Sequence, residues 1–223
     1  DINLGCSGFI YALAISGSLI NSRICKKGLI ICSEKYSSYI KKDDRTCRPL
    51  FSDGAAAVIV SSDSKNILGP FDLGTDGSGF DKLIVPKRNF YNMNKKLKYK
   101  KNNIFMNGAD VFTFTLSKVP KSINNILKES GKNIEDIDLF IFHQASKLVL
   151  DKLTKNLNIP DNKIFNNYNE IGNTVSATIP IALLEAHKRK KLKKNNLVML
   201  VGFGVGYSWG SCLLTWGNKF NSV

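Results

Sequence analysis

Residues 137–157 read IDLFIFHQASKLVLDKLTKNL, and the hydrophobic pattern of this stretch changes at one point. Ile137 to Phe142 form a short, mostly apolar run that is typical of a buried strand. After His143, leucines recur at helical spacing, which predicts a helix from Ser146 to Leu157. A strand followed directly by a helix is the unit from which α/β proteins are built.

The same alternation of strands and helices extends along the chain in both directions. Apolar runs predict buried strands, and apolar residues at helical spacing predict helices, one of which should kink or break at Pro120. The expected strands cover residues 29–32, 55–60, 197–203 and 208–216, and the expected helices cover residues 6–19, 109–130 and 175–189. These patterns predict the α/β fold class.

Composition excludes several classes of protein. Of the 223 residues, 43% are hydrophobic and 22% are charged, which excludes a disordered chain, a collagen and a coiled coil. No run approaches the roughly 20 apolar residues that a membrane span needs. The five cysteines include no CxxC pair and stand beside only two histidines, so their spacing gives no set of metal ligands and we expect no metal site. The cysteines are also too sparse for a secreted disulfide-bonded protein, so we expect the protein in the reducing cytoplasm.

Charge is the one unusual feature of the composition. Thirty-two Lys and Arg against 18 Asp and Glu give a net charge of +14. This excess is compatible with an anionic partner or with lysines scattered over a solvated surface. The lysines are not interleaved with aromatic residues in a stripe and no nucleic-acid motif is present, so we expect no nucleic-acid partner. A basic, non-catalytic binding protein remains an alternative hypothesis.

Three polar residues stand where an α/β architecture tends to place reactive groups. Cys6 begins an apolar helix, His143 follows a strand, and Asn173 ends a loop before a helix. A thiol at a helix N-terminus is expected to have a lowered pKa, which suits a nucleophile. A histidine and an asparagine nearby would supply two donors to a developing negative charge. Taken singly, each residue also has a purely structural explanation: Cys6 as a small core residue, His143 as a hydrogen-bonded structural group and Asn173 as a turn residue.

The sequence around these residues favours the catalytic interpretation. Five segments occur in a fixed order: residues 5–9 (GCSGF), 51–57 (FSDGAAA), 143–146 (HQAS), 172–177 (GNTVSA) and 202–211 (GFGVGYSWGS). Together they resemble β-ketoacyl-acyl carrier protein synthase III, a branch of the thiolase-fold condensing enzymes. The resemblance extends over nearly the whole chain.

The resemblance implies a thiolase-like fold of layers α-β-α-β-α, with the first half truncated and the second half complete. Residues 1–66 would be the remainder of the N-terminal half with the nucleophile helix, residues 67–103 a connecting segment, and residues 104–223 the C-terminal half. Residues that precede the nucleophile helix in the family would lie outside this sequence. We expect these 223 residues alone to be unstable or inactive.

The resemblance also assigns roles to single residues. Cys6 matches the nucleophile, and His143 and Asn173 match the catalytic histidine and asparagine. The backbone N–H groups of Cys6 and Val205 match the oxyanion hole, although the family usually has glycine at the second position. The remaining matches are Phe112 near the tunnel, Arg45 for coenzyme A, and Lys147 and Lys155 for carrier-protein docking, with Leu148 where the family has a docking arginine.

The implied activity is an acyltransferase reaction of fatty acid biosynthesis. Cys6 would take an acyl group from acyl-CoA, and decarboxylation of malonyl-acyl carrier protein would drive a Claisen condensation without a metal or bound cofactor. An acidic carrier protein suits a chain of charge +14. The family also implies a cytoplasmic homodimer without a membrane partner. The alternatives are a specialised acyltransferase that transfers to oxygen or nitrogen or serves secondary metabolism, and an inactive truncated fragment.

Overall fold

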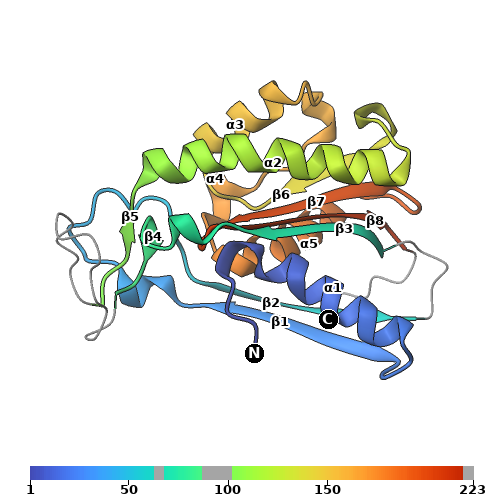
Figure 1. Cartoon of the computed structure of the whole chain (residues 1–223), viewed down its shortest axis with the longest axis horizontal. Helices are drawn as coiled ribbons and strands as arrows, with labels where there is room; N and C mark the ends of the chain where they lie inside the picture. The colour runs from blue at the N-terminus through green and yellow to red at the C-terminus, as the bar shows by residue number, and fades with distance from the viewer. Residues whose placement is uncertain (63–67, 87–101, 218–223) are drawn as a thin grey trace.

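A mixed four-stranded sheet occupies the middle of the molecule (Figure 1) in the computed structural model, which describes residues 1–62, 68–86 and 102–217. The strand order is β3–β8–β7–β6, with bounds Leu68–Thr75, Ser208–Thr215, Leu197–Gly204 and Leu139–Phe142. β6 and β7 are parallel, and the other neighbours are antiparallel. β6 and β7 are buried almost throughout, as expected for strands covered on both faces.

Helices cover both faces of this sheet. Figure 1 shows α2 and α3 on one face, and α1 and α5 on the other. Two apolar clusters fill the spaces, one on each side of β6 and β7. The helices are α1 (Gly8–Asn21), α2 (Gly108–Ser130), α3 (Lys147–Asn156), the short α4 (Tyr168–Ile171) and α5 (Thr178–Lys188), and the 3₁₀ turns are Gly5–Ser7, Tyr36–Tyr39, Gly77–Gly79, Ile134–Asp136, Asp161–Lys163 and Val175–Ala177.

A second sheet forms a fourth layer beneath α1 and α5 (Figure 1). It pairs β1 (Lys27–Glu34) with β2 (Gly54–Ser61) in antiparallel register. A small ribbon of β4 (Leu83–Ile84) and β5 (Phe105–Met106) lies apart from it. The layering confirms the predicted α/β class.

The expectation that both strands of this second sheet are buried is wrong. Their side chains alternate, and the inner face packs into the core beneath α1 and α5. The outer face leaves Leu29, Ile31 and Ile59 more than 60% exposed, at 62%, 66% and 71%. A continuous apolar run does not reveal which of its two faces is covered, because both faces carry apolar side chains.

Two further expectations can be compared with the structure. The connecting segment expected over residues 67–103 contains β3, a full strand that pairs with β8. Its glycine and proline residues have low strand propensity, so the sequence did not predict this strand. Gly74 is required by packing, because a Cβ there would lie 2.2 Å from the Trp209 ring. Of the kink or break expected at Pro120, the break does not occur, because α2 runs on to Ser130. Burial of its apolar face against the sheet offsets the lost hydrogen bond, whose cost is about 3 kcal/mol.

The three-part division of the chain remains a prediction. Its boundary between residues 66 and 67 lies outside the described residues. None of the helices within the described ranges combines the length and apolar character that a membrane span requires.

Candidate active site

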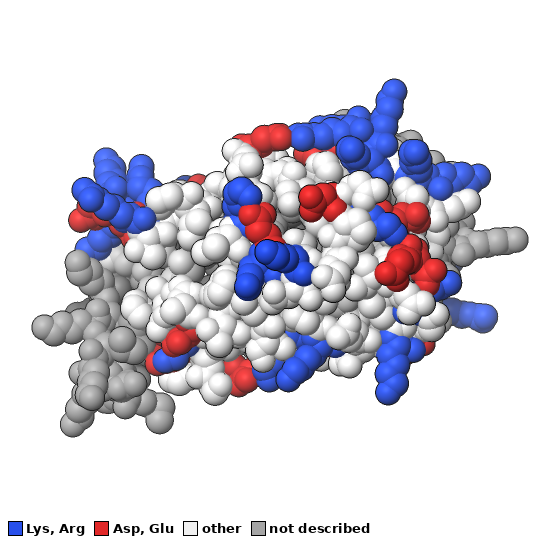
Figure 2. All heavy atoms as spheres, turned by 90° about the horizontal axis from the view of Figure 1, so that it is seen from above, with Lys and Arg blue, Asp and Glu red and all other residues white. Residues whose placement is uncertain are grey.

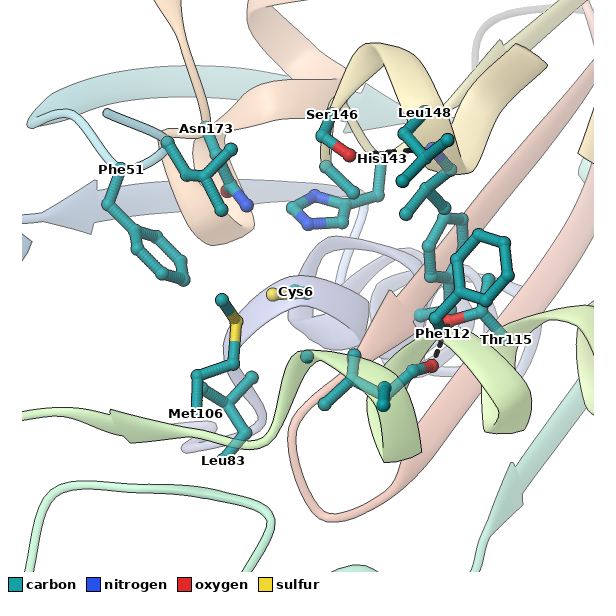
Figure 3. A pocket seen from close by; sticks show the side chains of 18 residues that line it. Cys6, Phe51, Leu83, Met106, Phe112, Thr115, His143, Ser146, Leu148 and Asn173 are labelled. Atoms are coloured by element: carbon teal, nitrogen blue, oxygen red, sulfur yellow. Dashed lines mark hydrogen bonds between the residues drawn. The ribbon is translucent and has the colours of Figure 1, made fainter. Parts of the chain in front are cut away.

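One mostly apolar cavity of about 390 Å³ brings the three predicted catalytic side chains together. Cys6, His143 and Asn173 all line it, although they come from segments far apart in the sequence. Figure 3 shows the imidazole and the amide pointing into the space above the sulfur. The rest of the wall is largely apolar and includes Phe51, Leu83, Met106, Phe112, Leu148 and Phe203.

Cys6 lies in the 3₁₀ turn Gly5–Ser7, directly before α1, and it is 4% exposed. Glycines of β7 allow this turn to approach the sheet. A Cβ on Gly202 would lie 3.0 Å from the Cα of Ser7, and one on Gly204 would lie 2.8 Å from Cβ and Sγ of Cys6. The buried hydroxyls of Ser7 and Ser208 are 2.6 Å apart and link the turn to β8.

The lowered pKa expected for Cys6 is wrong. Burial raises the pKa of the thiol to about 12, although hydrogen bonds from the backbone N–H groups of Val205 and of Cys6 itself favour the thiolate. The carboxylate of Glu34 raises the pKa further. Loss of water around the sulfur therefore outweighs the helix dipole, which contributes only fractions of a kcal/mol to about 2 kcal/mol.

The two backbone groups predicted to form an oxyanion hole both lower the pKa of the Cys6 thiol, against the larger effect of burial. Val205 lies between β7 and β8, where its N–H is directed at Cys6. The described non-glycine residues with a positive φ are six in number, and Val205 is not among them. Valine therefore occupies this turn without left-handed backbone strain, and the donor is kept.

His143 extends β6 by one residue, because its N–H donates to the carbonyl of Val201 at 2.7 Å. The ring is 2% exposed and its edge packs on Phe203, with centroids 5.5 Å apart. Nδ1 lies 2.7 Å from the hydroxyl of Thr178. Burial lowers the pKa of the imidazole to about 3, so His143 is neutral at neutral pH.

Asn173 is held by its own backbone and by its side-chain oxygen. Its N–H donates to the carbonyl of Leu50, and its carbonyl accepts from Ser52, both at 2.9 Å. Oδ1 accepts the N–H of Val175 at 2.9 Å. With Oδ1 engaged, the amide nitrogen is the group turned toward His143 in the cavity (Figure 3).

The three predicted basic contacts are not among the residues that line this cavity. Arg45, Lys147 and Lys155 are exposed, and Lys147 forms an ion pair with Asp151. Their predicted roles therefore remain predictions. Leu148 is 70% exposed and lines the cavity, as does Phe112. Within the described ranges, no group of three or more His, Cys, Asp or Glu side chains is placed to hold a metal ion.

Sequence reasoning missed two groups that contact the site. Thr178 supports the imidazole, and Glu34 accepts a hydrogen bond from Ser176 beside the Asn173 turn. Thr178 gives a weak signal, a polar residue at the start of an otherwise apolar helix. Glu34 gives a similar signal, a charge at the end of an apolar strand. Neither signal specifies the partner, which comes from another part of the chain.

Comparison with known proteins gives consistent matches over nearly the whole chain. A family model described as 3-oxoacyl-[acyl-carrier-protein (ACP)] synthase III matches residues 1–77, and the model of its C-terminal part matches residues 127–216. The chain is 35% identical to the β-ketoacyl-[acyl-carrier-protein] synthase III of Prochlorococcus marinus subsp. pastoris, covering 97% of this chain and 66% of that protein. It is 37% identical to the enzyme of the same name from Clostridium acetobutylicum, covering 97% of this chain and 67% of that protein.

Solved structures agree with these matches. The β-ketoacyl-[acyl carrier protein] synthase III from Thermus thermophilus superposes with a TM-score of 0.90 at 33% identity, covering 98% of this chain and 68% of that chain. The present chain thus spans about two thirds of the length of the proteins it matches.

Proposed function

Because this chain belongs to the 3-oxoacyl-[acyl-carrier-protein] synthase III family, we propose that it acts as a condensing enzyme of fatty acid biosynthesis. The observation that carries the proposal is the meeting of Cys6, His143 and Asn173 in one apolar cavity. A thiol opposite two polar groups that can donate hydrogen bonds suits covalent acyl transfer followed by enolate formation.

The first half-reaction moves an acyl group from coenzyme A to the protein. The sulfur of Cys6 attacks the thioester carbonyl, the bond to the coenzyme A sulfur breaks, and the thiol proton leaves with coenzyme A. Because the pKa of Cys6 is raised to about 12, attack must be coupled to loss of this proton. The N–H groups of Cys6 and Val205 are the donors for the tetrahedral oxyanion.

The second half-reaction uses His143 and Asn173. In the reacting tautomer the Thr178 hydroxyl turns from the Val175 carbonyl, 2.9 Å away, to donate to Nδ1 at 2.7 Å, which leaves the ring proton on Nε2 facing the cavity. Nε2–H and the Asn173 amide then donate to the thioester carbonyl of malonyl-acyl carrier protein while carbon dioxide leaves and an enolate forms. The enolate carbon attacks the acyl carbonyl, and the Cys6 sulfur departs and regains a proton. No metal or bound cofactor enters this scheme.

The proposed partners follow from the family and from surface charge. Arg45 is the proposed contact for coenzyme A, and Lys147 and Lys155 on α3 are the proposed contacts for an acidic carrier protein. Figure 2 looks down on α2 and α3 and shows lysine and arginine side chains gathered toward the rim of this face, with acidic groups among them. We also propose that the protein is a cytoplasmic homodimer. Sedimentation of the purified protein would test the dimeric state.

The proposal is tested by intact-protein mass after incubation with a panel of acyl-CoAs, using the protein at its full encoded length. A mass gain equal to the acyl group is expected for the wild type and not for Cys6→Ala. The acylated protein should then release labelled carbon dioxide from malonyl-acyl carrier protein. Absence of a Cys6-dependent adduct with every acyl-CoA would contradict the proposal.

A specialised acyltransferase is the second candidate. The observation that favours it is Leu148, an apolar and largely exposed residue that lines the cavity and stands where the family has a docking arginine. An enzyme of this kind would form the same adduct on Cys6. It would pass the acyl group to an alcohol or amine without releasing carbon dioxide from a malonyl thioester.

A further inference from the structure

A carboxylate lies where it works against the nucleophile. Glu34 is the last residue of β1 and is partly buried beside the Cys6 turn. Its negative charge raises the pKa of Cys6 and also that of the nearby Tyr36. Acyl transfer to sulfur would be easier without this charge, because the thiolate is the reactive form. The side chain therefore needs another explanation than help to Cys6.

The contacts of Glu34 point to the turn that carries Asn173. Its Oε1 accepts the hydroxyl of Ser176 at 2.6 Å, and the backbone N–H of Ser176 lies 3.4 Å from the same oxygen. Gly54, which pairs with Glu34 across the sheet, leaves room for the turn, since a Cβ there would lie 2.7 Å from Thr174. The end of the β1–β2 sheet is thus shaped to receive this turn.

The turn is strained at the residue between these contacts. Val175 has a φ of +55°, a left-handed conformation that a β-branched residue rarely adopts. Such strain persists only where surrounding contacts enforce it. The N–H of Val175 donates to Oδ1 of Asn173, and the next residue, Ser176, donates to Glu34. Relaxation of Val175 would break the first of these bonds and free the Asn173 amide to rotate.

We propose that Glu34 is a positioning residue that holds the 173–177 turn in its strained form and so aims the Asn173 amide at the substrate carbonyl. This inference rests on the proposed function, because its readout is the decarboxylation of malonyl-acyl carrier protein. Glu34 then has opposite effects on the two half-reactions: its charge slows acylation at Cys6, and its hydrogen bonds support decarboxylation. A residue needed only for folding would impair both.

Four single variants separate the two effects in the full-length protein. Glu34→Ala removes charge and acceptor, and Glu34→Gln keeps an acceptor without the charge. Ser176→Ala keeps the charge and removes the donor. Glu129→Gln removes a charge from the exposed end of α2 and is the matched control. Each is assayed for alkylation of Cys6 by iodoacetamide at pH 8 and for carbon dioxide release from malonyl-acyl carrier protein.

Glu34→Ala and Glu34→Gln should alkylate several-fold faster than the wild type, and Ser176→Ala should match it. Carbon dioxide release should fall roughly tenfold in Glu34→Ala and Ser176→Ala, as for a misaimed donor, and less in Glu34→Gln. The double variant Glu34→Ala/Ser176→Ala should be no slower than either single variant, because both remove one interaction.

Two results would overturn the inference while the proposed function stands. One is wild-type release of carbon dioxide in Ser176→Ala and Glu34→Ala. The other is a parallel loss of alkylation and decarboxylation in Glu34→Gln. Failure of the wild type itself to form the acyl adduct would instead contradict the proposed function.

Discussion

Cys6 should react with iodoacetamide slowly at pH 8, and its rate should keep rising with pH well beyond the neutral range. The reason is the pKa of about 12 that burial imposes on the thiol. An ordinary cysteine has a pKa near 8.5, so at pH 8 roughly one Cys6 in 10⁴ is ionised, against about a quarter of ordinary thiols. A more basic thiolate is a better nucleophile, which recovers about half of this loss on a logarithmic scale. Cys6 should therefore react roughly 50-fold more slowly than an ordinary thiol.

The assay is peptide mass spectrometry of alkylated protein between pH 7 and pH 10. Cys25, which is partly exposed, reports the reagent in the same sample, and Cys6→Ala identifies the Cys6 signal. A tenfold rise in the Cys6 rate per pH unit is expected throughout. A rate that levels off below pH 8 would refute the reasoning, because it would mean that the backbone donors and the helix dipole outweigh burial.

Three further predictions concern the surroundings of the site. Thr178→Val should lower carbon dioxide release at least about tenfold by removing the partner of His143 Nδ1, and Thr178→Ser should restore it; equal rates for the two variants would exclude a role for the hydroxyl. Gly204→Ala should slow acylation of Cys6 roughly 100-fold in the mass assay, because the new Cβ would lie 2.8 Å from the sulfur. Between pH 6.5 and about 3, His143 binds a proton when the protein is unfolded but not when it is folded, because its folded pKa is about 3. The free energy of unfolding should therefore fall as the pH is lowered through this range, by up to about 1.4 kcal/mol per pH unit. His143→Gln should flatten this dependence in urea unfolding between pH 6 and pH 4.5, and an unchanged slope would contradict the assignment.

The sequence was sufficient to predict which reactive side chains meet. Cys6, His143 and Asn173 each stand at the end of a strand or the start of a helix, and local pattern and motif identify such positions. It was not sufficient to predict their ionisation. The pKa of Cys6 depends on how much water the fold removes and on a carboxylate, Glu34, that is distant in the sequence. The helix dipole, which can be foreseen, is the smaller effect.

The same distinction explains the errors in the fold. β3 was missed because its register is set by β8, more than a hundred residues later, and not by its own residues. The burial of β1 and β2 was overestimated because exposure depends on what lies against each face. Local signals predicted element type well where periodicity was strong, as in α3, where Ser146 caps the helix by accepting the N–H of Val149.

β7 has a consequence for how accurately the two reacting groups stay aligned. Val201 of this strand bonds the backbone of His143, and Gly202 and Gly204, one and three residues further on, abut the Cys6 turn. We therefore expect a thermal fluctuation of the strand to displace both groups in the same direction, so that the distance between His143 and Cys6 changes little. Asn173 belongs to a different element, the turn beside Glu34, which meets the Cys6 turn only through side-chain packing such as that of Val175 near Gly5, so this motion is shared with it less directly. Misalignment should accumulate first at the amide, so the alignment of the asparagine limits how far the site can be perturbed before decarboxylation fails.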